Sequence, residues 1–165
     1  MYLRFLACLL LLTLPFASEA QQMNNDNLEK ILYVMIDTII GEGGAWQFAI
    51  KDVPMMCITD ETNNRMRIIS PIKKMEEVTD EEKESVLAAN FHSALDVRYA
   101  VADDIMSVAF IHPLKELTKN QVIDAVSQVY NATLTYGSTY SSTDLVFPKS
   151  EEDEKKEKRR RGQRN

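Results

Sequence analysis

Short stretches in which apolar and polar residues alternate constrain the fold of this chain more than any other feature. Trp46 and Phe48 alternate with small or polar neighbours, Met66 and Ile68 alternate with arginines, and the pattern returns over residues 97–101. A period of two places successive side chains on opposite faces of a strand. The chain therefore needs a sheet that buries one face of these strands against helices.

Three helices are predicted around the strands. An apolar stripe at steps of three and four runs to Ile39, and the glycines of residues 41–44 are expected to end this first helix. Two capping boxes start the others, and the second helix is expected to end near Ser93 and to bury Leu87 and Phe91. The capping-box pairs are Thr79 with Glu82 and Thr118 with Gln121.

The predicted order is helix, three strands, helix, two strands, helix, or α-β-β-β-α-β-β-α. This order favours an α+β fold with an antiparallel sheet of about five strands and helices packed on it. One face of such a sheet could stay open, and we expect Trp46, Phe48 and Tyr99 on that face. With Met35 of the first helix, these three are the candidate partner-binding residues.

The two ends of the chain differ from its middle. Residues 1–20 combine Arg4, an apolar run and small residues up to Ala20, which is typical of a signal peptide and predicts an exported protein, periplasmic or secreted. A membrane anchor is the rival interpretation, but a spanning helix needs about 20 apolar residues. Residues 21–148 are predicted to form a single α+β domain, and residues 149–165 a disordered tail of mixed charge.

The charge and the cysteine content limit which partners the protein can bind and whether it can form a disulfide. Residues 21–148 hold ten basic and nineteen acidic residues, a net charge of −9, which disfavours binding of nucleic acid by the folded domain. The tail has a net charge of +3 and could contact anionic surfaces. Cleavage would remove Cys8 and leave Cys57 as the only cysteine, which predicts no internal disulfide and a buried thiol.

No credible catalytic set is found. His92 and His112 are the only histidines, and Asp96 lies four residues from the first, so a metal site or an acid–base pair can be drawn from these three. Their spacing matches no familiar zinc pattern. No catalytic residue, metal or cofactor is therefore predicted, and the protein is not expected to be an enzyme.

The order of elements, the amphipathic first helix and the acidity over residues 26–137 resemble the class I type III secretion chaperones and the related YbjN-like proteins. This resemblance implies a protein that dimerises, binds extended segments of client proteins and carries no cofactor. The chain departs from these chaperones in one respect, since they act in the cytoplasm and have no export signal.

The leading hypothesis is therefore an exported, non-enzymatic module that binds a protein or peptide and could form a homodimer. One alternative is a metal-dependent or acid–base enzyme that uses His92, Asp96 and His112. Another is a structural protein of the cell envelope that is held by its basic tail.

Overall fold

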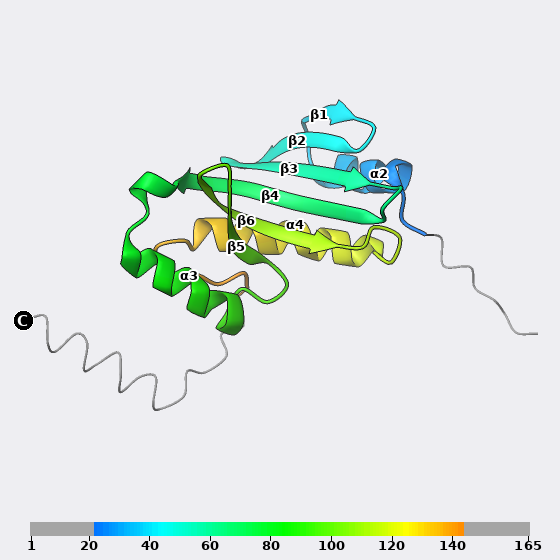
Figure 1. Cartoon of the computed structure of the whole chain (residues 1–165). Helices are drawn as coiled ribbons and strands as arrows, with labels where there is room; N and C mark the ends of the chain where they lie inside the picture. Colours follow the sequence, from blue (N-terminus) through cyan, green and yellow to red (C-terminus); the bar gives the residue numbers. More distant parts are fainter. Residues whose placement is uncertain (1–21, 144–165) are drawn as a thin grey trace, which may run out of the picture.

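The computed structural model describes residues 22–143, which form an antiparallel sheet and three α-helices packed against it (Figure 1). The six strands lie in the order β1-β2-β3-β4-β6-β5. This confirms the predicted α+β class, with one strand more than the five expected. The predicted signal peptide and tail lie outside the described residues. The elements are α2 (Asn25–Met35), β1 (Ile39–Glu42), β2 (Ala45–Ile50), β3 (Val53–Asp60), β4 (Arg65–Lys74), the 3-10 turn η1 (Met75–Glu77), α3 (Asp80–His92), β5 (Arg98–Ala102), β6 (Ile105–His112) and α4 (Lys119–Leu134).

The additional strand is β1, where the sequence predicted the end of the first helix. Helix α2 ends at Met35, and the prediction that its stripe reaches Ile39 is wrong. Three consecutive β-branched residues, 38–40, favour an extended backbone. Gly43 and Gly44 both have positive φ and make the two-residue turn of a β-hairpin, so they connect two strands and do not end a helix.

Helices α2 and α4 cover one face of the sheet, and α3 lies beside its β5 edge (Figure 1). Helix α4 packs on β3, β4 and β6, α2 packs beside α4, and α3 packs against β5. The side chains between these layers form one continuous core. The largest fully buried side chains are Trp46, Leu28, Leu32, Met66, Ile68, Leu114, Val97, Val108, Val122, Val126, Val129 and Cys57.

Both predicted capping boxes are confirmed. The Thr79 hydroxyl accepts a hydrogen bond from the Glu82 backbone N–H, and the Glu82 carboxylate accepts one from the Thr79 N–H. Thr118 and Gln121 make the same reciprocal pair at the start of α4. Each box satisfies two backbone donors that the helix itself leaves unpaired, which explains why so local a signal locates the helix starts.

The buried side of α3 differs from the prediction. Leu87 and Phe91 are 70% and 86% exposed, whereas Val86 and Ala89 pack into the core. The apolar residues of α3 lie on two faces of the helix, so their spacing alone could not show which face meets the sheet. The prediction that Leu87 and Phe91 are buried is therefore wrong.

Cys57 lies in β3 and is fully buried, as the sequence analysis expected. Burial raises the pKa of its thiol to about 12, so the unreactive thiol form dominates at neutral pH. Within residues 22–143, every helix is too short or too polar to cross a membrane.

Candidate functional site

The face of the sheet opposite the helices is a candidate binding surface. Strand register arranges its side chains in rows, and we call two adjacent central rows the open face. One row crosses all six strands and holds Ile40, Gln47, Met56, Ile69, Ala109 and Arg98. The row beside it holds Glu42, Ala45, Ile58, Arg67 and Ile111.

The centre of the open face is apolar and carries one positive charge. Ile111 is 58% exposed, Ile58 is 37% exposed, and Met56 and Ile69 are half-buried. Arg67 pairs with both exposed isoleucines across the strands. The ion pairs found within residues 22–143 all involve lysines, so no carboxylate of the described chain neutralises this arginine. An apolar surface with an unneutralised guanidinium suits a peptide that offers apolar side chains and a carboxylate.

Sequence reasoning did not single out these residues, although the signal for them was present. The alternation that assigned Met66 and Ile68 to the core leaves Arg67 and Ile69 on the other face of the same strand. The pattern shows which residues share a face. It does not show that one of the two faces stays uncovered.

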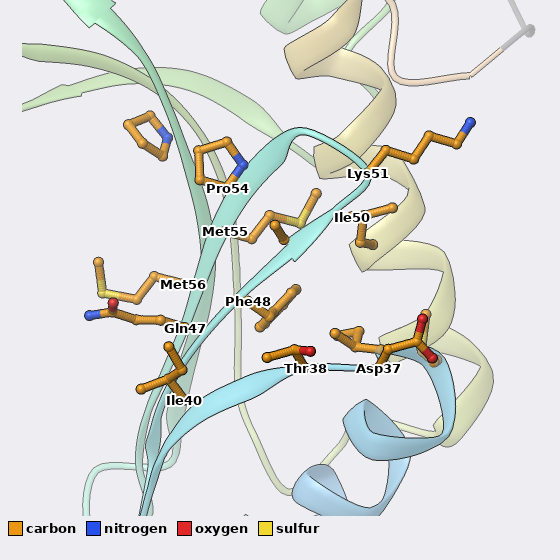
Figure 2. A pocket seen from close by; sticks show the side chains of 14 residues that line it. Asp37, Thr38, Ile40, Gln47, Phe48, Ile50, Lys51, Pro54, Met55 and Met56 are labelled. Atoms are coloured by element: carbon orange, nitrogen blue, oxygen red, sulfur yellow. The ribbon is translucent and has the colours of Figure 1, made fainter.

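A hollow of about 910 Å³ adjoins the open face at the edge of β2. Strand β1 pairs only with residues 45–48, so Ala49 and Ile50 have no neighbouring strand on that side. Figure 2 shows Ile40, Gln47 and Met56 on one side of this edge, with Ile50 and Lys51 on the other. The hollow is lined by Met35, Ile36, Asp37, Thr38, Ile40, Gln47, Phe48, Ala49, Ile50, Lys51, Pro54, Met55, Met56 and Pro71.

The two edges of the sheet differ in how accessible their backbone is. Strand β1 forms one edge and pairs only with β2. At the other edge the side-chain amide of Asn90 donates to the backbone oxygen of Tyr99 at 3.1 Å and accepts from its backbone N–H at 2.8 Å. Asn90 therefore takes the place that an added strand would occupy on β5, and an added strand could pair more readily with β1.

Two of the predicted partner-binding residues line the hollow, and the expected position of the aromatic ones needs correction. Trp46 and Phe48 are 1% and 6% exposed and lie on the helix-covered face. The indole nitrogen of Trp46 donates to Glu29 of α2 at 3.0 Å, which ties β2 to that helix. Phe48 and half-buried Met35 line the hollow, so both can touch a ligand there. Partner binding by these residues stays a prediction.

Tyr99 also lies in the core. It is 5% exposed, and its hydroxyl donates to the backbone oxygen of Ala132 at 2.8 Å. Its ring contacts those of Tyr136 and Tyr140, and burial raises the pKa of its hydroxyl to about 12. Tyr99 is therefore part of the core and does not lie on the open face.

The two histidines and Asp96 have separate structural partners. Asp96 accepts a hydrogen bond from the Gln128 side chain of α4 at 3.1 Å, while His92 packs edge-on against Phe91. His112 stacks on an aromatic ring of its own strand, and its Nδ1 lies 2.8 Å from the oxygen of Pro113. Among residues 22–143, no three His, Cys, Asp or Glu side chains are grouped closely enough to hold a metal ion.

Comparisons with known proteins support the fold. No protein-family model and no curated protein matches the sequence. Seven solved chains match by structure. One comes from the HopA1-SchA chaperone-effector complex, with a TM-score of 0.52 and 8% identity over 66% of this chain and 88% of that chain. Another comes from the ExsC-ExsE complex, with the same TM-score and identity over 66% of this chain and 90% of that chain. The fold is thus similar to one found in a chaperone-effector complex.

Proposed function

We propose that this protein is a non-enzymatic binding module that holds an extended segment of a protein partner on the open face and along β1. The observation that carries the proposal is the row of Ile58, Arg67 and Ile111, which is apolar, exposed and positively charged at its centre. An apolar face of this kind usually marks a partner site, since water is otherwise left in contact with it.

The geometry supports recognition by strand addition. A partner segment that pairs with β1 would receive backbone hydrogen bonds from the free edge of the sheet. Every second side chain of the segment would then lie on the same side of the sheet as the open face, next to the hollow of about 910 Å³. The Met35 and Met56 side chains in the hollow can adapt to partners of different shape. The similar fold found in the HopA1-SchA chaperone-effector complex supports a protein as the partner.

A pair of matched substitutions tests the proposal. Peptides selected from a random library on the wild-type protein should bind Ile111→Asp at least tenfold more weakly, because the new carboxylate stands on the open face. Leu134→Asp in α4 is the control, since Leu134 is 56% exposed and Ile111 is 58% exposed. Equal affinity of the selected peptides for both variants would contradict a role for the open face.

We further propose that the mature protein is exported and that two copies can pair through β1 when no partner segment occupies this edge. The first part rests on residues 1–20 and is tested by sequencing the N-terminus of the protein recovered from the cell envelope, where we expect Gln21. The second part rests on the uncapped edge of β1. Light scattering after size-exclusion chromatography should give twice the chain mass at micromolar concentration, and a monomer there would refute pairing.

A further inference from the structure

Leu87 and Phe91 form an exposed apolar pair on α3. They are four residues apart in the helix, so their side chains lie one above the other on the same face. Their exposed fractions of 70% and 86% are higher than those of any large apolar residue on the open face. No other element of the described chain buries this pair.

The surface next to the apolar pair is strongly acidic. Residues 76–84 contain six acidic residues and one lysine, a net charge of −5. Lys83 binds Asp80 at 2.9 Å, Lys73 binds Glu82 at 2.7 Å and Lys74 lies 3.6 Å from Glu76, so lysines pair with three of the six acidic residues. The outer side of α3 thus changes from acidic at its N-terminal end to apolar at its C-terminal end.

The described chain ends next to the C-terminus of α3, whose last turn contains Phe91. After α4 the chain returns to α3, where the Ser142 N–H donates to the backbone oxygen of Ser93 at 3.1 Å. The Ser93 hydroxyl donates to the backbone oxygen of Tyr140 at 2.7 Å. Ser93 is the C-cap of α3 and lies two residues beyond Phe91, so Ser142 approaches the end of the helix that carries the apolar pair.

We propose that residues 145–161 dock along the outer side of α3 and cover it. Residues 145–147, Leu-Val-Phe, would lie on the apolar pair. Residues 155–161 carry six basic residues and one acidic residue, a net charge of +5, and would lie along residues 76–84, whose net charge is −5. A segment that runs antiparallel to α3 meets the apolar C-terminal half of the helix first and the acidic N-terminal half second. The segment presents its apolar residues and then its basic residues in this same order.

The distances allow this arrangement. Along α3, Phe91 and Asp80 are separated by about 17 Å at 1.5 Å per residue. The eight residues from Phe147 to Lys155 span up to about 26 Å when extended. The surplus length lets the acidic residues 151–154 loop away from the acidic helix, whose carboxylates would repel them.

The docked segment would act as a tethered competitor for the outer side of α3. A tether this short gives an effective concentration in the millimolar range, so a free partner of similar chemistry would have to bind much more tightly to displace it. The charged half of the contact would weaken with salt, while the apolar half would persist.

Disulfide trapping in the full chain tests the proposal. In a Cys8→Ser background, Phe91→Cys is combined with Phe147→Cys, and the control combines Leu134→Cys with Phe147→Cys. Leu134 is a matched control because it is 56% exposed and precedes Thr135, which is hydrogen-bonded to Ser141 near the end of the described chain. Native Cys57 can stay, since it is fully buried.

Mass spectrometry under mild oxidation measures how fast each disulfide forms. We expect the intramolecular disulfide of the variant with Phe91→Cys and Phe147→Cys to form roughly tenfold faster than that of the control with Leu134→Cys and Phe147→Cys. Equal rates, a faster control or a product of two linked chains would overturn the proposal. Circular dichroism verifies that each variant is folded. Replacing the arginines at 159–161 by glutamate should slow trapping in low salt but not in 1 M NaCl, and an unchanged rate in low salt would refute the charge pairing.

Discussion

Glu82 offers a quantitative test of how the N-terminus of α3 is stabilised. Its carboxylate accepts a hydrogen bond from the Lys73 ammonium at 2.7 Å and another from the Thr79 N–H at 2.8 Å. Of these, the bond from Lys73 contributes most to lowering the pKa of Glu82 from 4.5 to about 2. The substitution Glu82→Gln removes the charge but keeps an oxygen for the capping box, as native Gln121 does at the start of α4.

The expected loss of stability follows from the pKa. A change from 4.5 to about 2 corresponds to at most about 3 kcal/mol of stabilisation at neutral pH. The side chains of Lys73 and Glu82 are 25% and 20% exposed, so water screens the pair and the realistic loss is about 1 kcal/mol. Glu82→Ala also removes the capping bond and should cost about 1 kcal/mol more.

The lowered pKa of Glu82 determines how its contribution to stability changes with pH. A carboxylate whose folded pKa is lowered contributes its full stabilisation above the unfolded pKa of 4.5 and loses it as pH falls toward about 2. Urea unfolding followed by circular dichroism at pH 7 and pH 3 should therefore show the gap between wild type and Glu82→Gln shrinking at the lower pH. A gap that stays constant, or a glutamine variant as unstable as the alanine variant, would refute this reasoning.

Two further predictions concern the hairpin and the buried thiol. Gly41→Ala should destabilise β1, because φ is +108° and a new Cβ would lie 2.1 Å from a backbone oxygen of β2. Gly43→Ala is the control, since its new Cβ meets no atom within 4 Å. Hydrogen exchange of the β1 amides compares the two variants, and equal protection would count against the steric argument. Cys57 should not react with a thiol reagent at pH 8 until urea unfolds the protein, since burial raises its pKa to about 12; rapid labelling of the native protein would contradict the buried position.

What the sequence predicted correctly is mostly local. The capping boxes at Thr79 and Thr118 depend on residues three positions apart, so they could be identified without knowing the fold. The end of α2 was missed because Ile39 fits a helical stripe as well as it fits a strand. Only its pairing with Phe48 in β2 decides between the two.

The candidate site was harder to predict because it depends on which surface remains uncovered. Alternation shows that Trp46 and Phe48 share a face, but only the position of α4 and α2 shows that this face is buried. In α3, Leu87 and Val86 are adjacent apolar residues, and the packing against β5 selects Val86. In both β2 and α3, tertiary contacts determine which residues are buried, and no short stretch of sequence contains these contacts.

The amide of Asn90 has a consequence for the size of any assembly. Because it occupies the backbone of Tyr99 at the β5 edge, extension of the sheet is favoured through β1. Two chains joined through β1 would form a longer sheet that has β5 as its outermost strand at each end, with Asn90 bonded to the backbone of Tyr99. Addition of a third chain would then be disfavoured, which would protect a chain with an exposed strand from polymerising into fibres.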